Sequence, residues 1–435
     1  MPKPVPKLWK NWAGNQACAP YAMERPTSEQ ELISIVKGAA ANDRRVKVVG
    51  AGHSFTGIAC TDGHLIDLSS YERVLAHDAA AGTVTVQAGA PLQTLCDELD
   101  KRGLALENMG DIAYQSIAGA TSTATHGTGT QFGNLSSRIV GLRIITADGS
   151  IIDCSADERP EVFEVARVGL GALGVLSTVT LQAVPAFRLH AVEEAMPVDD
   201  VLSDFAGFMG QTDHVEFYWV PHTRWALTKR NTRTQEPAAP RTRVKEVMDD
   251  IVLTNGAFGL LCRLGRRWPR AIPRLAKIIP SASSKVEYTD RSDRVFTSPR
   301  FVRFYEMEYA IPAESVPEAL NRVRALVDRL GVPISFPVEV RVVAPDDIPL
   351  STAYARATGY IAVHVYQGTG YDQYFQGVEA IMNDYGGRPH WGKMHFQTAE
   401  TLAPRYPRWE AFQKVRAELD PERRFANPYL DRVLG

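Results

Sequence analysis

The chain has 435 residues, of which 45% are hydrophobic and 23% charged, and its formal net charge at pH 7 is −2. This length exceeds one ordinary hydrophobic core and suits two domains. The small net charge gives no reason to expect nucleic acid as a partner. The five cysteines are scattered and never form a C-x-x-C pair. They therefore indicate neither a disulfide framework nor a zinc site, and they favour a reducing, cytoplasmic location.

Targeting and membrane-spanning patterns are not evident. The first seven residues carry positive charge but lead into no apolar segment, so they do not resemble a secretory signal. No stretch approaches the ~18 uninterrupted apolar residues of a spanning helix. We therefore expect a soluble protein without a transmembrane segment.

Helical and strand patterns alternate in the first third of the chain. Ser28 and Glu31 form a capping-box pair in front of an apolar helical pattern. Strands are predicted at residues 46–49, 65–68 and 83–86, and a helix at residues 91–99 with Pro91 at its first position. We expect an α+β domain.

A glycine-bounded loop, Gly-Ala-Gly-His-Ser-Phe-Thr-Gly at residues 50–57, follows the first of these strands. Glycines let the backbone approach an anion, and successive N–H groups form a nest for pyrophosphate oxygens. Two better-known motifs fail by one residue, since a Rossmann fingerprint needs glycine in place of Phe55 and a serine-hydrolase elbow needs glycine in place of Thr56. The loop is interpreted as a phosphate cradle that brings His53 within reach of a cofactor.

Two further glycine-rich loops follow. Residues 116–130 are rich in glycine, serine and threonine, which favours either a flat ligand or an irregular loop packed on itself. Residues 169–174 match G-x-G-x-x-G, but a helical pattern precedes them and a strand pattern follows at 175–181. This order is the reverse of a dinucleotide fingerprint, so an NAD site is discounted. Three such loops favour one shared ligand.

After about residue 185 the pattern changes to longer strands, for example at residues 215–220 and 303–309, separated by an apparent insertion at residues 233–280. That insertion contains a basic stretch without acidic residues, in which apolar residues are interleaved with Arg263, Arg266, Arg267, Arg270, Arg274 and Lys277. Its simplest interpretation is a solvated face, because Gly265, Pro269 and Pro273 interrupt a long helix. The alternatives are peripheral contact with an anionic membrane and docking of an acidic electron acceptor.

Two strands near the end of the chain carry polar residues on one face. Glu339 and Arg341 alternate with valines in residues 336–343, and His364 shares a face with Tyr366 in residues 360–366. Alternation alone favours a solvated face over a ligand-binding one. Further on, two histidines at 390 and 395 are five residues apart, which does not match a helical zinc motif, so no metal site is expected.

Several of these segments together resemble one family. They are the His53 cradle, Ala-Thr-His-Gly-Thr-Gly at 124–129, Glu-Val-Arg at 339–341, His-Trp-Gly-Lys at 390–393 and the closing segment 420–429. The set is similar to the aldonolactone oxidoreductases, flavoproteins of the vanillyl-alcohol oxidase superfamily, over nearly the whole chain and in order. The resemblance implies a two-domain α+β fold of that type. Residues 1–185 would bind FAD, residues 186–400 would form a substrate-binding cap with an antiparallel sheet flanked by helices, and residues 401–435 would return to the FAD domain.

The resemblance also implies how FAD is held between the two domains. The cradle histidine of such proteins is commonly linked to the flavin 8α-methyl group, and His53 occupies that place. A second, cysteinyl link would need a cysteine at residues 116–130, where there is none. We expect one covalent bond, with an unlinked His53 as the alternative. The implied FAD-binding residues are Gly50, Ala51, Gly52, His53, Ser54, Phe55, Ser116, Ala118, Gly119, Thr123, Thr125, His126, Gly127, Gly129, Gly174, Val175, His390 and Lys393.

Four residues are implied to be catalytic. Glu339 and Arg341 resemble the family's substrate-orienting pair, and Lys393 resembles the lysine beside the flavin pyrimidine edge. Oxidation of a secondary alcohol needs an aimed carbinol hydrogen, a proton acceptor and positive charge near the flavin. Arg341 or Lys393 would supply the charge, and His364 is the candidate proton acceptor, with a structural role as its alternative.

The implied reaction oxidises the C2 hydroxyl of an aldono-1,4-lactone to a ketone, which tautomerises to an ascorbate-type enediol, and L-gulono-1,4-lactone is the favoured substrate. The electrons would pass to O2 or to a cytochrome or quinone-type carrier. One alternative is an oxidase of open-chain alditols such as xylitol or sorbitol. Another, from a different class, is a flavin-binding protein without catalytic activity.

Overall fold

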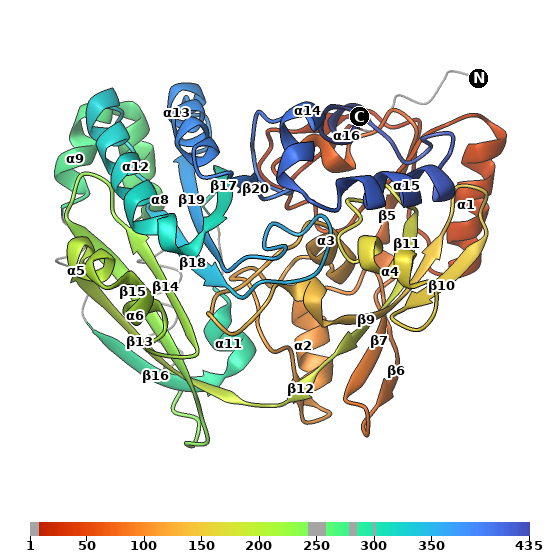
Figure 1. The fold of residues 1–435 in the computed structure, drawn as a ribbon, viewed down its shortest axis with the longest axis horizontal. Coiled ribbons are helices and arrows are strands. Elements are labelled where there is room, and N and C mark those ends of the chain that lie inside the picture. Colours follow the sequence, from red (N-terminus) through yellow and green to blue (C-terminus); the bar gives the residue numbers. More distant parts are fainter. Residues whose placement is uncertain (1–7, 242–257, 278–284, 299–301) are drawn as a thin grey trace.

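The computed structural model describes residues 8–241, 258–277, 285–298 and 302–435. The chain forms two halves (Figure 1), one made from the first part of the chain together with the C-terminal helices, and the other from the middle of the chain. The short strand β12 (Val184–Pro185) lies where the chain passes from the first half to the second.

A three-stranded parallel sheet starts the first half, with the order β3 (Ala22–Glu24), β5 (His64–Asp67) and β4 (Val46–Val49). Helix α1 (Glu29–Ala41) packs on it through Leu32, Val36 and Ala39, which are one helical turn apart and buried. Because β4 ends at Val49, the glycine-bounded loop begins at the end of a buried parallel strand, which is a common position for phosphate-binding loops.

The second sheet of this half is antiparallel. Its order is β10 (Ile151–Ser155), β9 (Ile139–Ile145), β11 (Val175–Gln182), β7 (Thr83–Gln87) and β6 (Val74–Asp78). Burial alternates strictly along β11, as expected for a strand with one face on a core. Helices α2 (Leu92–Asp100), α3 (Ile117–Ser122) and α4 (Pro160–Ala166) contribute to the same hydrophobic core.

The other half is built on an eight-stranded antiparallel sheet. Its order is β16 (Val286–Arg291), β13 (Arg188–Pro197), β15 (Trp225–Thr234), β14 (His214–Trp219), β18 (Val338–Val343), β19 (Thr358–Tyr366), β17 (Phe304–Pro312) and β20 (Arg388–Pro389). One face packs on helices α5 (Val198–Ser203), α6 (Phe205–Met209), α12 (Val316–Leu330) and α13 (Asp372–Asn383) through a core of alternate strand residues. The predicted antiparallel sheet flanked by helices is therefore present.

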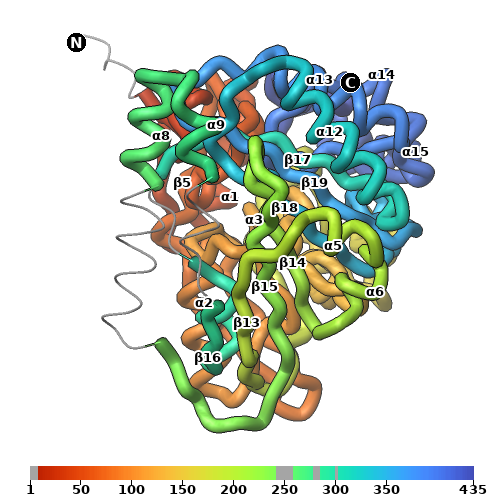
Figure 2. Tube along the Cα trace, turned by 90° about the vertical axis from the view of Figure 1, so that its left-hand side faces the viewer, coloured from red at the N-terminus to blue at the C-terminus, as the bar shows by residue number. Residues whose placement is uncertain are grey.

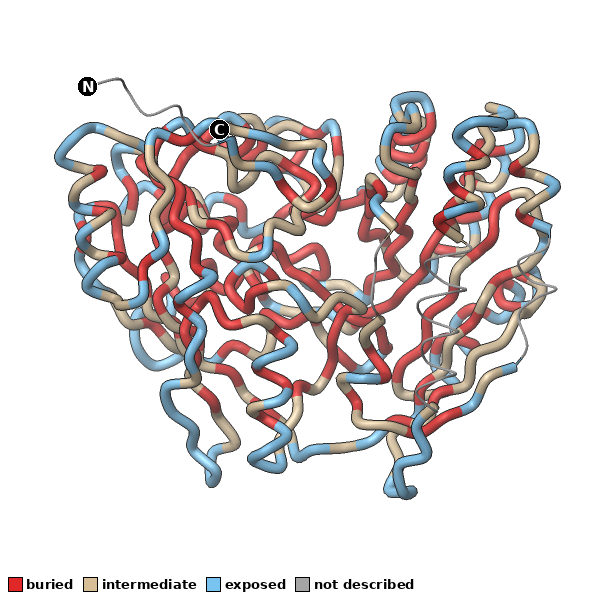
Figure 3. The backbone as a smooth tube through the Cα atoms, turned by 180° about the vertical axis from the view of Figure 1, so that it is seen from behind, coloured by how far each residue is buried: buried red, intermediate tan, exposed pale blue. Residues whose placement is uncertain are grey.

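The C-terminal helices α14 (Ala399–Leu402), α15 (Trp409–Leu419) and α16 (Pro428–Leu434) lie with the first half (Figure 1). Phe412 of α15 and Leu430 of α16 share a hydrophobic core with Phe163 of α4. The buried backbone runs through both halves (Figure 3). The remaining elements are β1 (Trp9–Lys10), β2 (Ala17–Cys18), β8 (Leu104–Ala105), α8 (Phe258–Arg267), α9 (Ile272–Leu275), α11 (Ser292–Phe296) and short 3₁₀ turns.

Local details depart from the sequence predictions in two places. Pro91 caps α2 in an extended conformation instead of occupying its first turn, and its carbonyl accepts from the Leu95 amide. The Ser28 hydroxyl accepts from the Glu31 amide as predicted, but the Glu31 carboxylate accepts from the Thr27 amide, so only half of the capping box forms.

The predicted insertion at residues 233–280 overlaps the end of β15, and its residues 242–257 and 278–280 lie outside the described residues. The described part forms two short helices, α8 and α9, with a break at Trp268 and Pro269. Gly265 lies within α8 and Pro273 in the first turn of α9, where a proline is tolerated. In the described residues, no helix has both the length and the apolar character needed to cross a membrane.

Candidate active site

The loop after β4 has the geometry of an anion cradle. Gly52 has φ +66°, a conformation that favours glycine. The amides of four consecutive residues, 51 to 54, donate no hydrogen bond to a described residue. A Cβ on Gly50 would lie 1.9 Å from Ser116 Oγ, so the loop contacts the start of α3 directly. Unpaired amides beside a helix N-terminus fit a pyrophosphate group.

His53 projects from this cradle toward a cavity. Its ring stacks on Trp12 with 5.4 Å between centroids. Both residues line a cavity of about 220 Å³ together with Ile112, Tyr114 and Ser298. Burial first, and then the positive charge of Lys393, lower the pKa of His53 to about 4. The imidazole is therefore neutral at pH 7 and keeps a nitrogen lone pair.

The loop after α3 connects the two halves of the molecule. Thr128 Oγ1 donates to the carbonyl of Val215 at 2.5 Å, and the Gly129 amide donates to Val342 at 2.8 Å. These contacts fix the loop to strands β14 and β18 of the large sheet. Thr125 Oγ1 is buried and has no hydrogen-bond partner among the described residues, so it is free to bond a ligand. The unpaired Thr125 hydroxyl and the free amides of the cradle together fit FAD.

One face of the large sheet is polar, and the strand register places its residues in rows. Tyr218 of β14 lies opposite Glu339 of β18, which lies opposite Ala362 of β19, and Ala362 in turn lies opposite Glu308 of β17. In the two adjacent rows, Arg341 of β18 lies opposite Tyr360 of β19, and His364 of β19 lies opposite Glu306 of β17.

The solvated face that alternation favours for Glu339 and Arg341 is wrong, because the two side chains are only 7% and 6% exposed. The first half of the molecule covers this face. The loop with Thr128 and Gly129 reaches β14 and β18 directly, and Asp111 lies beside Arg341.

Arg341 is shared between carboxylates. Its Nε lies 2.8 Å from Glu216, its Nη2 lies 2.5 Å from Glu339, and Asp111 is 3.8 Å away. The Tyr218 hydroxyl bonds both glutamates at 3.1 and 3.0 Å. Burial raises the pKa of Glu339 to about 7, with Arg341 opposing this shift and the charges of Asp111 and Glu216 adding to it. The side chain can thus exchange a proton near neutral pH.

A second network joins Lys393, Glu306 and His364. Lys393 Nζ forms an ion pair with Glu306 and lies 5.3 Å from the ring centre of Phe55 in the cradle. His364 Nε2 lies 3.3 Å from the same carboxylate, and its Nδ1 donates to the carbonyl of Pro337. Burial lowers the pKa of His364, but Glu306 and Glu339 together outweigh it, so the net shift is upward. Both ring nitrogens of His364 are thus engaged, and the upward shift of its pKa favours the protonated form.

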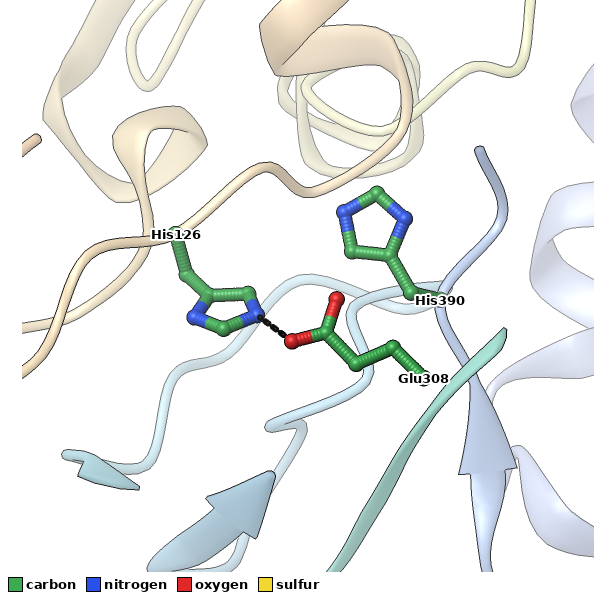
Figure 4. Close-up of side chains that lie close together, drawn as sticks. All are labelled: His126, Glu308 and His390. Carbon is green, nitrogen blue, oxygen red and sulfur yellow. Dashed lines mark ion pairs between the residues drawn. The ribbon is translucent and has the colours of Figure 1, made fainter. Parts of the chain in front are cut away.

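His126, Glu308 and His390 form a third buried group (Figure 4). His126 donates through Nδ1 to the Gly127 carbonyl at 2.9 Å, and its Nε2 lies 3.2 Å from Glu308. His390 Nδ1 accepts from the Gly392 amide at 3.0 Å, which leaves the proton on Nε2, and burial lowers its pKa to about 3. The protein's own contacts thus account for the positions of all three side chains.

The structure thus brings together predicted residues from distant segments, and it gives some of them other partners. His126 and His390 face Glu308. Gly174 packs on β9, where a Cβ would come within 2.5 Å of Ile144, and Val175 is fully buried, so packing accounts for both. Sequence reasoning missed a group of site residues, namely Trp12, Glu216, Tyr218, Glu306, Glu308 and Tyr360. Alternating polar residues in the predicted strands 215–220 and 303–309 were the available signal for four of them.

The chain is similar to known proteins over its whole length. A sequence profile of the D-arabinono-1,4-lactone oxidase family matches residues 179–433, and one of an FAD-binding domain matches residues 20–155. An L-gulono-1,4-lactone dehydrogenase of Mycobacterium tuberculosis is 50% identical, covering 98% of this chain and 99% of that protein. An L-gulonolactone oxidase of Bos taurus is 35% identical, covering 98% of both.

Among solved structures, a cholesterol oxidase from B. sterolicum superposes with a TM-score of 0.82 at 18% identity, covering 98% of this chain and 96% of that one. A solvent-stable cholesterol oxidase gives a TM-score of 0.83 at 20% identity, with the same coverage. At this identity the likeness concerns the fold alone. It confirms the predicted α+β fold of the vanillyl-alcohol oxidase type, and the FAD-binding match confirms the predicted cofactor. The chain is an FAD-dependent oxidoreductase and belongs to the D-arabinono-1,4-lactone oxidase family.

Proposed function

We propose that this oxidoreductase converts the C2 hydroxyl of an aldono-1,4-lactone, in the first place L-gulono-1,4-lactone, to the 2-keto lactone, which tautomerises to an ascorbate-type enediol. The observation that carries the proposal is the buried pair of Glu339 and Arg341 on the polar face of the sheet. The name of the 50% identical relative supports the choice of substrate.

FAD, when bound, supplies the acceptor for the hydride that leaves C2. Glu339 accepts the hydroxyl proton in this proposal, because a general base works best with a pKa near the operating pH and the pKa of Glu339 is raised to about 7. In this proposal Glu339, and not His364, is therefore the proton acceptor. The Tyr218 hydroxyl, which bonds Glu339 at 3.0 Å, fixes the direction of the carboxylate.

Arg341 orients the lactone in this proposal. Its Nε and Nη2 are engaged by Glu216 and Glu339, whereas its Nη1 makes no hydrogen bond to a described residue and can donate to a lactone oxygen. Lys393 holds a positive charge beside the cradle. Burial lowers the pKa of Lys393, but Glu306, Glu308 and Asp111 together outweigh it and raise the pKa, so Lys393 stays charged at neutral pH.

Three further points belong to the proposal. His53 forms a covalent bond to the flavin 8α position, which its neutral imidazole beside the cavity supports. The electrons pass to O2 or to a cytochrome or quinone-type carrier. All five cysteines are free, which supports a reducing, cytoplasmic location.

The test is to make the flavin-loaded protein anaerobic, add L-gulono-1,4-lactone and follow the visible absorbance of oxidised flavin before air is admitted. Bleaching that recovers rapidly in air indicates an oxidase, and bleaching that persists indicates a dehydrogenase with another acceptor. Bleaching by xylitol but not by the lactone would replace the proposal with an alditol oxidase. Bleaching by neither would support a flavin-binding protein without catalytic activity.

A further inference from the structure

The hairpin of β1 and β2, residues 9–18, lies against the cradle and also against the second half of the molecule. Three short hydrogen bonds run from it to carbonyl groups of the cradle, namely Trp12 N to Gly52 at 2.8 Å, Asn11 Nδ2 to Ser54 at 2.9 Å and Asn15 Nδ2 to Phe55 at 2.9 Å. On the other side, Gln367 Nε2 donates to the Ala13 carbonyl at 2.7 Å. Figure 2 shows the red start of the chain beside the green helix α8, and Ala13 shares a buried cluster with Cys262 of that helix. The hairpin is thus fixed to both halves.

Trp12 is the hairpin residue that meets His53. Its ring stacks on the imidazole, and the two ring planes are inclined by 29°. It also packs edge-on against Phe304 of β17, with 5.4 Å between ring centres, and against Phe55, with 6.3 Å between ring centres. Because these contacts come from the cradle and from the large sheet together, the Trp12 ring has little room to turn. It presents one fixed flat surface to His53.

The stack is the contact that orients the His53 ring. Among the described residues, neither ring nitrogen of His53 takes part in a hydrogen bond. An imidazole without a hydrogen bond can turn about its side-chain bonds, so the flat surface of Trp12 selects its orientation. The same contact keeps water from one face of the ring. Burial is the largest cause of the lowered pKa of His53, with Lys393 acting in the same direction and Asp111 against it.

We propose that Trp12 is a positioning residue for covalent attachment of the flavin, because its stacked ring holds the His53 imidazole in the orientation that forms the bond. The inference rests on the proposed bond between His53 and the 8α carbon. In that step a C–H bond of the methyl group and the N–H bond of the imidazole break, and one C–N bond forms. Two protons go to solvent, and two electrons reduce two molecules of ferricyanide, the oxidant supplied in the assay below. The lone pair of a neutral imidazole forms the bond, and Trp12 itself forms none.

The experiment measures binding of FAD and formation of the bond separately in the full-length chain. Protein produced in a riboflavin-starved host is mixed with FAD and ferricyanide. Total flavin is read from the absorbance after desalting, and covalent flavin from the fluorescence that remains after acid precipitation. We expect Trp12→Ala to bind as much FAD as the parent protein but to form the bond about tenfold more slowly. Trp12→Phe keeps an aromatic stack and should restore most of the rate.

The pH dependence of bond formation gives a second measurement. In the parent protein the rate should be the same at about pH 5.5 and at pH 8, because a pKa of about 4 keeps His53 neutral at both. In Trp12→Ala, water reaches the imidazole and its pKa should rise toward the ordinary 6.5, while Lys393 and Asp111 still face it. The variant should therefore lose up to a further tenfold in rate at about pH 5.5. A loss of packing alone would not produce this dependence.

Trp268→Ala is the matched control, since it removes a tryptophan that is 58% exposed, and it should form the bond at the parent rate. Trp12→Leu keeps an apolar side chain without a ring and should behave as Trp12→Ala does, and thermal unfolding checks that each variant is folded. Equal rates in the parent protein and both ring-less variants would overturn the proposal. So would loss of total FAD in both, because Trp12 would then serve binding. A parent protein that binds FAD without forming the bond would refute the covalent link itself, and this inference with it, while leaving lactone oxidation untouched.

Discussion

Glu339 and Glu216 bind the same guanidinium, that of Arg341, with Arg341 Nη2 2.5 Å from Glu339 and Arg341 Nε 2.8 Å from Glu216. The three residues come from neighbouring strands, β14 and β18, and all are buried. One positive charge therefore serves two carboxylates, and Asp111 adds a third at 3.8 Å. Burial, together with the charges of Asp111 and Glu216, raises the pKa of Glu339. Burial acts in the same direction on Glu216, but the positive charges of Arg341 and Lys229 outweigh it, so the pKa of Glu216 falls.

The first prediction concerns Glu339 as proton acceptor. Glu339→Gln should lower kcat with L-gulono-1,4-lactone by roughly 10²–10⁴-fold. In the parent protein kcat/KM should fall as the pH drops below about 7, because the Glu339 carboxylate is then protonated. This acidic limb of the pH profile of kcat/KM should be absent in the variant. The flavin absorbance spectrum serves as the control, since the variant should retain FAD. Unchanged turnover would remove Glu339 from the mechanism.

The same substitution should have an opposite effect on stability. The pKa of Glu339 is about 7 in the folded protein against 4.5 for an ordinary glutamate. Between these values the folded state binds more protons than the unfolded state, so the unfolding free energy falls as pH rises from about 4.5 to about 7. Glu339→Gln has no buried carboxyl group to ionise. Its free energy of unfolding should therefore exceed that of the parent protein at pH 8 by up to about 3 kcal/mol, with little difference at pH 4.5. Thermal unfolding at the two pH values measures it.

A third prediction isolates Glu216, which does not contact the reacting atoms in the proposed mechanism. Glu216→Gln removes a nearby negative charge and frees Arg341 from one of its carboxylate partners, so the pKa of Glu339 should fall. The acidic limb of the kcat/KM profile should move to lower pH by about one unit or more. Tyr218→Phe is the matched variant, because loss of a donor to the Glu339 carboxylate should move the limb to higher pH. Identical shifts in both variants would mean that only packing has changed.

The sequence shows much of the fold but little of this network. The strands that carry Glu216, Glu306 and Glu339 were predicted within a few residues, because each alternates polar and apolar positions. Faces were assigned only for the strands that carry Glu339 and His364, and the pairing register was not visible. Nothing in the pattern of one strand shows that Tyr218 lies opposite Glu339.

Burial of the polar face was the main error, and its cause is physical. A strand with one apolar and one polar face has the same pattern whether water or another domain covers the polar side. Here the loop at Thr128 and Gly129 crosses from the first half of the molecule and bonds the edges of β14 and β18. Contacts between segments this far apart leave no periodic signal. The resemblance of motifs identified Glu339 and Arg341 where periodicity could not.

The fourth prediction tests the covalent bond to His53. Flavin should remain with the parent protein after acid precipitation and appear as a fluorescent band on a denaturing gel. His53→Ala should still bind FAD, because the backbone amides of the cradle are unchanged, but should release it on denaturation. Ser54→Ala in the same loop is the control and should keep the flavin attached. Release of flavin by the parent protein would contradict the covalent bond and leave FAD binding unaffected.

The last prediction concerns the contact between the cradle and α3. A Cβ on Gly50 would lie 1.9 Å from Ser116 Oγ and 2.8 Å from Ser116 Cβ, and Ser116 cannot withdraw because its hydroxyl caps α3 at the Gly119 amide. Gly50→Ala should therefore displace the loop and reduce the flavin content of the purified protein severely. Adding Ser116→Gly removes both clashing atoms and should restore part of the flavin, while loss of the Ser116 cap destabilises α3 by only about a few tenths of a kcal/mol, because glycine is itself a tolerated N-cap residue. The control is Gly38→Ala in α1, where a Cβ meets nothing within 4 Å. It should leave flavin content unchanged and stabilise the helix by roughly 1 kcal/mol. If Gly50→Ala keeps its flavin, close contact between these two loops is not what holds the cofactor.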